Sequence, residues 1–248
     1  MGGIMRVSIG IPCYNAERYV ARAIESCLEQ SVKPFEIIVC DDGSSDKTEQ
    51  VASGYASHGV VVAKNGENRG IGYTRNRIIS LCRGDVLLFL SADDVLLPHA
   101  VETVMSYAER YPDSFLYSDY YIINERGERI GEYRAPEFGT REEFVKACVE
   151  SARQDRMFVA YCISARIELW RKIPFWEDKK IGEDLAHLLE SVLVHDARFV
   201  HIPFPLFCYR IHSDMQTNVH RNRIHENNLD TFSRINRMLG TQVVQWLG

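Results

Sequence analysis

A short apolar run at residues 86–90 (VLLFL) ends just before the acidic pair Asp93-Asp94, and Pro98 then begins a probable helix. A run this short, rich in Leu, Val and Phe, predicts a strand buried on both faces of a sheet. Open α/β sheets bind ligands at the carboxyl ends of their strands. Asp93 and Asp94 are therefore placed where a divalent cation and a phosphorylated ligand are expected.

The first half of the chain alternates runs of strand length with segments of helical periodicity. Strands are expected at residues 7–12, 35–40, 60–63 and 86–90. Helices are expected from Val20 to Leu28, after Ser44 or Ser45, across residues 71–82, and from Pro98. This βαβα order predicts an α/β fold with a mostly parallel central sheet and helices on both of its faces. The strand at 35–40 also ends in two acids, Asp41 and Asp42, which favours an enzyme that holds a nucleotide diphosphate through a metal.

The second half is less regular. Residues 114–134 predict an antiparallel hairpin with a turn at Arg126-Gly127, and residues 139–150 and 181–194 predict helices. Residues 199–211 are extended but contain Pro203 and Pro205, which predicts an edge strand or a short pair of strands. We expect a single domain over residues 1–220, divided into a ligand-binding half (5–110) and a second half (111–220). Residues 221–248 are expected to form a helical arm that could join copies of the chain into a homo-oligomer.

Composition and charge exclude several classes of protein. The net charge of -5 argues against a general nucleic-acid binder, which would usually be basic. The seven cysteines are an odd number without a C-x-x-C spacing, which indicates reduced thiols in a cytoplasmic protein. No apolar stretch reaches the roughly 18 to 20 residues of a membrane span, and the N-terminus lacks the pattern of a signal peptide. A cytoplasmic protein is expected, with peripheral association at the inner face of a membrane left open.

Three segments together carry a resemblance to a known family. They are VSIGIPCYNAERYVARAIESCLEQS, FEIIVCDDGSSDKTEQVA and NRGIGYTRNRIISLCRGDVLLFLSADDVLLP, and they resemble family 2 of the inverting glycosyltransferases, which have the GT-A fold. The resemblance covers about residues 5–110 and continues more loosely to Tyr209-Arg210. It implies transfer of a sugar, with inversion, from a nucleotide-diphosphate sugar to a hydroxyl group of a glycan or lipid-linked glycan. It further implies Mn²⁺ or Mg²⁺, a UDP-sugar as the most frequent donor, and a setting in bacterial polysaccharide or cell-envelope synthesis.

The resemblance also implies which residues bind the donor. The residues that it places at the nucleotide are Pro12, Tyr14, Asn15, Asp41, Asp42 and Arg75. Asp42 is expected on the base and Tyr14 beside it. Taken alone, Asn15 could instead be the N-cap of the first helix, and Arg75 could form an ordinary ion pair on a helix surface.

Ser91-Ala92-Asp93 occupies the position of the family's D-x-D motif. Ser91 stands where an acid is usual, so Asp93 is the carboxylate expected on the metal, while Asp94 could cap the following turn. The resemblance places Arg210 near the donor pyrophosphate and His212 at the metal, although His212 could equally be an ordinary surface residue.

Glu183 and Asp184 lie in the first turn of a predicted helix, where acids commonly complement the helix dipole. The resemblance implies that Asp184 is the catalytic base, with Glu183 orienting it. Residues 140–180 are expected to line the acceptor site. Its candidate aromatic side chains, each more often a core residue, are Tyr161, Trp170, Phe175 and Trp176.

Other functions remain open or are disfavoured by particular residues. Ser91 leaves open a degenerate domain that binds a nucleotide sugar or a partner without turnover. A nucleotidyltransferase would usually carry a glycine-rich loop after the first strand, where this chain has Pro12-Cys13-Tyr14-Asn15. A Rossmann dehydrogenase is disfavoured, because Gly70-x-Gly72 lacks the third glycine of the full fingerprint.

Overall fold

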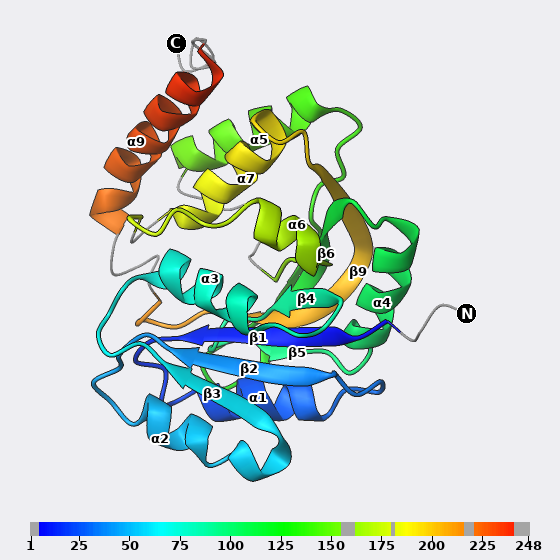
Figure 1. The fold of residues 1–248 in the computed structure, drawn as a ribbon, viewed down its shortest axis with the longest axis vertical. Helices are drawn as coiled ribbons and strands as arrows, with labels where there is room; N and C mark the ends of the chain where they lie inside the picture. Colours follow the sequence, from blue (N-terminus) through cyan, green and yellow to red (C-terminus); the bar gives the residue numbers. More distant parts are fainter. Residues whose placement is uncertain (1–4, 155–161, 180–181, 216–220, 241–248) are drawn as a thin grey trace.

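A single curved sheet runs through the molecule and carries helices on both faces (Figure 1). The computed structural model describes residues 5–154, 162–179, 182–215 and 221–240. In these residues the sheet has nine strands. Eight of them follow the order β3-β2-β1-β4-β8-β6-β9-β5, and the ninth, β7, pairs with β6. The strands are β1 (Val7–Cys13), β2 (Glu36–Asp41), β3 (Val60–Lys64), β4 (Val86–Phe89), β5 (Val95–Leu96), β6 (Ser114–Ile123), β7 (Arg129–Tyr133), β8 (Ser164–Arg166) and β9 (Arg198–Arg210).

The helices connect and cover these strands. They are α1 (Val20–Leu28), α2 (Thr48–Ser53), α3 (Ile71–Leu81), α4 (Ala100–Arg110), α5 (Arg141–Gln154), α6 (Ile167–Lys172), α7 (Glu183–Leu193) and α9 (Arg221–Leu239), with a short 3₁₀ helix η1 (Ala56–His58). In Figure 1, α3 and α6 lie on one side of strands β1 to β4, and α1 and α2 lie on the other. The described part of the chain contains no helix long and apolar enough to span a membrane.

The parallel strands of the first half form as predicted. β1 pairs in parallel with β2 and β4, and β2 pairs in parallel with β3. Because successive side chains of a strand point to opposite faces, Ile38 belongs to the core on the α3 side, whereas Ile37 and Val39 belong to the core on the α1 side. This double burial explains why the sequence reads as uninterrupted apolar runs, and it confirms the prediction of an α/β fold with a mostly parallel central sheet.

Two helices of the first half begin later than predicted. α2 begins at Thr48 and not directly after Ser44 or Ser45, because the hydroxyl of Ser44 bonds to Asp41 and receives the backbone N–H of Asn15. α4 begins at Ala100 and not at Pro98. Between β4 and α4 the chain first forms the two-residue strand β5, which pairs with β9.

The extended conformation predicted for residues 199–211 is confirmed through Arg210, but the prediction of an edge strand or a short pair of strands is wrong. These residues belong to one 13-residue strand, β9 (Arg198–Arg210), which lies between β6 and β5 in the sheet. The register between β6 and β9 shifts at Asp119, opposite the part of β9 that holds Pro203 and Pro205. The irregularity lets the two prolines, which cannot donate to a ladder, interrupt the pairing locally without ending the strand. The β6–β7 hairpin is confirmed.

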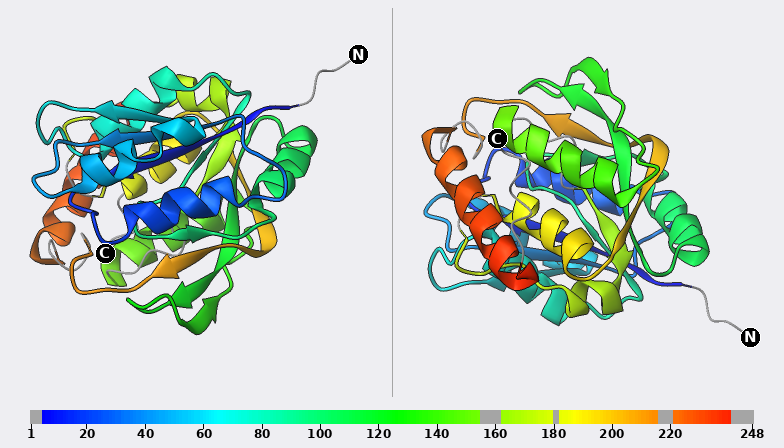
Figure 2. Two further views of the ribbon diagram at one scale, coloured as in Figure 1. Left: turned by 90° about the horizontal axis from the view of Figure 1, so that it is seen from below. Right: turned by 90° about the horizontal axis from the view of Figure 1, so that it is seen from above.

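Helices α5, α7 and α9 pack together above the second half of the sheet, as the right-hand view of Figure 2 shows. Phe232 and Ile235 of α9 are buried in the same core as Leu188 of α7. The seven cysteines are free thiols, and all but Cys208 are buried. Tyr161 and residues 241–248 of the predicted arm lie outside the described residues.

Candidate functional site

The loops that follow β1 and β2 hold one another at the carboxyl edge of the sheet. Asn15 adopts a left-handed backbone conformation (φ 49°), and its Oδ1 accepts the backbone N–H of Ser45 at 2.9 Å. The Asn15 N–H donates in turn to the Ser44 hydroxyl at 2.9 Å. Asn15 is therefore not the N-cap of α1, which begins five residues later at Val20, and it orders the neighbouring loop instead. Pro12 is buried in β1, and Tyr14 is 38% exposed at the strand's end.

The two acids at the end of β2, Asp41 within the strand and Asp42 after it, are both buried and both accept from nearby backbone N–H groups. Asp41 accepts the N–H of Ser44 at 3.1 Å. Asp42 accepts three donors, namely Nδ2 of Asn65 at 2.7 Å and the N–H groups of Arg69 and Gly70, each at 2.9 Å. These bonds fix the approach to α3. A carboxylate offers about four acceptor positions, so Asp42 retains room for a further donor.

A hollow of about 330 Å³ opens beside this loop, lined by Asn65, Gly66, Glu67, Arg69, Tyr73 and Arg77. The Arg69 guanidinium lies over the ring of Tyr73, 4.2 Å from its centroid. Arg69, Tyr73 and Arg77 lie in the third segment that carries the family resemblance, but the hollow itself was not predicted, because it depends on how separate segments fold together.

Arg75 is turned inward toward α7. Its Nη1 donates to Oε1 of Glu183 at 2.6 Å, and the two side chains are only 4% and 9% exposed. Arg75 does form an ion pair, but the pair is buried and does not lie on the helix surface, as the alternative had predicted. Burial raises the pKa of Glu183 to about 7, and the Arg75 guanidinium opposes that rise.

Asp94 and Arg210 hold the loop that carries Asp93 in place through hydrogen bonds. Asp94 is buried and accepts the backbone N–H of Arg210 at 2.9 Å. The Arg210 side chain donates from Nε to the carbonyl of Asp93 at 2.7 Å, and from Nη1 to the carbonyls of Asn124 and Glu125 at 3.2 Å. These contacts go to the backbone, so in this structure Arg210 fixes the loop after β4. Ser91 is half-buried and Ala92 is buried in the same loop.

Asp93 and His212 meet at this edge. Nε2 of His212 lies 3.1 Å from Oδ2 of Asp93, and the His212 side chain is only 6% exposed while Asp93 is 29% exposed. His212 packs against Tyr19, with 4.7 Å between ring centroids. The alternative that His212 is an ordinary surface residue is therefore wrong.

A carboxylate and an imidazole are a partial donor set for a hard divalent cation. Mg²⁺ commonly binds through one or two carboxylates and completes its shell with substrate phosphates and water. Among the described residues there is no group of three or more His, Cys, Asp or Glu side chains that could hold a metal. Asp93 and His212 could therefore supply only part of the shell of such an ion.

Glu183 and Asp184 occupy the first turn of α7, as predicted. The helix buries the predicted face of Leu185, Leu188, Leu189 and Val192. Asp184 is half-buried, and its Oδ1 accepts the N–H of Leu185 at 2.7 Å. Burial raises the pKa of Tyr209 in β9, and the carboxylates of Asp94, Asp93 and Asp184 raise it further.

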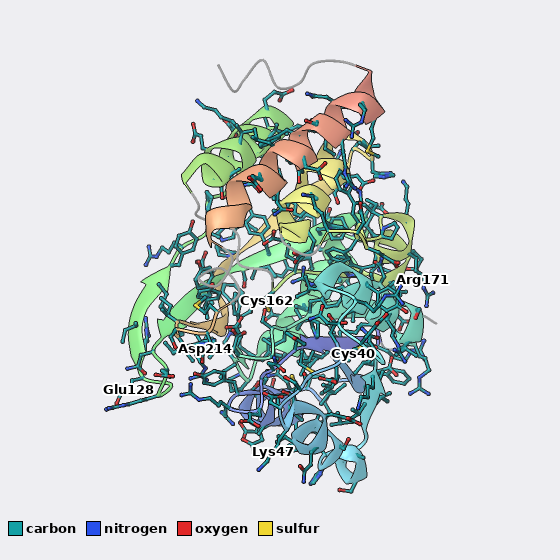
Figure 3. All side chains as sticks on the ribbon, turned by 90° about the vertical axis from the view of Figure 1, so that its left-hand side faces the viewer. Cys40, Lys47, Glu128, Cys162, Arg171 and Asp214 are labelled. Atoms are coloured by element: carbon teal, nitrogen blue, oxygen red, sulfur yellow. The ribbon has the colours of Figure 1, made fainter. Side chains whose placement is uncertain are left out.

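Several contacts made by Tyr19, which packs on His212, and by its neighbour Arg18 were not predicted. Arg18 pairs with Glu125 at 2.5 Å and with Asp214 at 3.5 Å, and the Tyr19 hydroxyl donates to Glu125 at 3.2 Å. Figure 3 shows this corner from the side, with Asp214 labelled near the hairpin that carries Glu128. The contacts join residues more than 100 positions apart, and no local pattern in the sequence marks them.

The candidate aromatic residues of the acceptor site are mainly core residues. Trp170 is fully buried and Phe175 is 3% exposed, and their rings stack with centroids 5.8 Å apart. Trp176 is half-buried, and the guanidinium of Arg234 lies over its ring at 5.3 Å.

Comparison with known proteins agrees with this geometry. The model of "Glycosyl transferase family 2" matches residues 8–164, and the chain belongs to this family. The chain is 35% identical over 157 residues to a chondroitin synthase of Escherichia coli, covering 62% of this chain and 22% of the relative. It is 32% identical over 142 residues to the E. coli UDP-Glc:alpha-D-GlcNAc-diphosphoundecaprenol beta-1,3-glucosyltransferase WfgD, covering 57% of this chain and 56% of the relative.

Solved structures resemble nearly the whole chain. The structure of S. aureus TarS residues 1–349 in complex with UDP-GlcNAc matches with a TM-score of 0.68 at 18% identity, covering 92% of this chain and 73% of that one. The complex with UDP matches with a TM-score of 0.66 at 20% identity, covering 94% and 74%. This likeness confirms the GT-A type of fold. The sequence matches to the two E. coli relatives span between about a fifth and just over half of their lengths.

Proposed function

We propose that the protein is a metal-dependent inverting glycosyltransferase that uses a nucleotide-diphosphate sugar. The observation that carries the proposal is the contact of Asp93, after β4, with His212, after β9, in a member of family 2 whose helix α7 begins with Glu183 and Asp184. A UDP-sugar is the favoured donor, because a relative is named for UDP-Glc and similar folds were solved with UDP and UDP-GlcNAc.

The chemistry requires one base and one departing diphosphate. Asp184 takes the proton of the acceptor hydroxyl as its oxygen attacks the anomeric carbon of the donor. The bond to the diphosphate breaks on the opposite side, so the configuration inverts in a single displacement. Asp93 and His212 would hold Mn²⁺ or Mg²⁺, which when bound supplies positive charge to the departing diphosphate. Asp42, Tyr14 and the loop after β3 are proposed to hold the nucleoside.

The acceptor is proposed to be a hydroxyl group of a glycan or a lipid-linked glycan in bacterial polysaccharide or cell-envelope synthesis. The names of the two E. coli relatives support this class of acceptor. A cytoplasmic protein that works at the inner face of a membrane fits such an acceptor. A homo-oligomer formed through α9 stays a prediction. It is supported by the exposed side chains of Leu229 and Met238 on that helix, and light scattering would measure the oligomeric state.

The test is a screen of nucleotide sugars and glycan acceptors that follows nucleotide release, with and without Mn²⁺. The wild-type chain should turn over at least one donor with Mn²⁺, and Asp184→Asn should reduce turnover by about 10²- to 10⁴-fold without weakening nucleotide binding. Glu109→Gln, an exposed acid on α4, is the matched control and should keep full turnover. Nucleotide binding without release by the wild type across the screen would instead support the binding module that Ser91 leaves open.

A further inference from the structure

Residues 175–179 follow α6 and precede Glu183 and Asp184 in the sequence, and one side of them is held by α3. Asn76 donates from Nδ2 to the carbonyl of Phe175 at 2.9 Å and accepts the Phe175 N–H at 2.9 Å. The carbonyl of Trp176 approaches Gly72 so closely that a Cβ there would lie 2.6 Å from it. The segment is thus docked against the helix that also carries Arg75.

The other side of the same segment is held by α9. Lys179 is 2% exposed, and its ammonium donates to the carbonyl of Asn227 at 2.6 Å and lies 3.5 Å from the carboxylate of Asp230. Nearby, Arg234 of α9 pairs with Asp178 at 2.7 Å. Burial lowers the pKa of Lys179, and Asp230 opposes that change.

α9 also contacts the N-cap of α7. Gly182 takes a left-handed conformation (φ 69°), and a Cβ there would lie 3.5 Å from Oδ1 of Asn228. Asn228 in turn donates from Nδ2 to the carbonyl of Ala152, in the last turn of α5, at 3.2 Å. One turn of α9 therefore lies against both residues 178–179 and the N-cap residue of α7, Gly182.

We propose that Lys179 is a positioning residue for the catalytic helix. By binding Asn227 and Asp230 of α9, it fixes residues 175–179 and so sets where α7 begins and where Asp184 lies. This inference rests on the proposed function, in which Asp184 is the base. A displacement of about 1 Å in a reacting group can cost about 10²-fold in rate even when its cause lies away from the chemistry. The nucleotide is proposed to bind at the ends of β1, β2 and β4, so its affinity should not depend on Lys179.

The experiment compares Lys179→Met with Lys172→Met in the full chain. Lys172 is an exposed lysine at the end of α6, so its substitution removes the same charge without touching α9. UDP is titrated into each variant by calorimetry to count binding sites, and kcat is measured per UDP-binding site. We expect kcat of Lys179→Met to fall by about 10- to 100-fold with UDP affinity unchanged, and Lys172→Met to match the wild type.

A second variant keeps the proposal testable if Lys179→Met fails to fold. Asp230 is 41% exposed, so Asp230→Asn should fold and lower kcat less than Lys179→Met does. Where both variants fold, the double variant should lower kcat by less than the product of the two single-variant factors, because Asp230 acts partly through the ammonium of Lys179 and partly through Arg234, whose Nε lies 3.1 Å from its carboxylate. A kcat per UDP site equal to that of Lys172→Met, or a parallel loss of UDP binding and turnover, would overturn the positioning role.

Asp184→Asn in the same series separates this inference from the proposed function. Turnover retained by Asp184→Asn contradicts the proposed base. Turnover lost in Asp184→Asn but intact in both Lys179→Met and Asp230→Asn contradicts only the role of Lys179.

Discussion

Nη1 of Arg75 lies 2.6 Å from Oε1 of Glu183, so a buried ion pair joins α3 to α7. α3 follows the loop that Asp42 orders, and α7 carries Asp184. The pair therefore connects the two halves of the chain that the proposed reaction needs together. The Arg75 guanidinium also lies 5.2 Å from the centroid of the Phe175 ring, in the segment that precedes α7.

The first prediction concerns this pair. Arg75→Met should lower the free energy of unfolding by about 3–5 kcal/mol, because it leaves a buried carboxylate without its partner. Adding Glu183→Met should recover most of that loss, since both buried charges are then gone. Urea unfolding of the single and double variants measures both effects, with Arg126→Met in the exposed hairpin turn as the control. If the losses of Arg75→Met and Glu183→Met simply add in the double variant, the two residues are not coupled and the prediction is contradicted.

Much of the first half could be predicted from sequence, because a strand buried on both faces needs apolar residues at every position. The strand predicted at residues 86–90, observed as β4 (Val86–Phe89), followed from this requirement. The contacts of Arg210, Asp42 and Arg75 could not be predicted, because each depends on residues that are brought together only by the fold. β9 was misjudged because a proline signals a break locally, whereas the register shift against β6 that accommodates it is a property of two strands.

The second prediction tests the three bonds to Asp42. Asp42→Asn replaces one carboxylate oxygen with an NH₂ group, which then faces a donor from Asn65, Arg69 or Gly70. We expect the free energy of unfolding to fall by about 1–3 kcal/mol, together with weaker nucleotide binding if Asp42 also holds the base. Denaturant unfolding and calorimetry measure the two effects separately. Asp113→Asn, on an exposed turn, should change neither.

The third prediction concerns acid stability and His187. This residue is buried among Phe175, Trp170 and Phe115, and burial lowers its pKa from 6.5 to about 3. Between about pH 3 and 6.5, His187 is therefore protonated in the unfolded state but neutral in the native state. The free energy of unfolding is highest above pH 6.5 and falls as the pH is lowered toward 3. At pH 5 the loss from this residue is about 2 kcal/mol.

His187→Phe should remove the contribution of this residue to the pH profile, because it keeps an aromatic ring and removes the titrating group. It also loses the bond between Nε2 and the carbonyl of Ile173 at 3.1 Å, so its stability at pH 7 should be lower than that of the wild type. Glu183 acts in the opposite sense, since its raised pKa favours the native state below pH 4.5 and this contribution is lost as the pH rises toward 7. Unfolding curves from pH 5 to 7.5 measure the slopes, and His58→Phe, which is exposed, should retain the wild-type slope.

The last prediction concerns the metal and the serine that replaces the usual acid. Asp93→Ala should abolish the Mn²⁺-dependent part of nucleotide binding, because it removes the carboxylate of the proposed site. Ser91→Asp should preserve or tighten Mn²⁺-dependent binding, because it restores a second acid to the loop after β4. The structure keeps Asp93 in place mainly through its backbone, whose carbonyl accepts from Arg210, so removing the side chain should leave the loop and the fold intact. Calorimetric titration of UDP with and without Mn²⁺ tests both variants, with Asp113→Ala as the exposed control. If Asp93→Ala folds and keeps the full Mn²⁺ effect, the ion is held by other residues, and the pairing of Asp93 with His212 serves the structure of the loop alone.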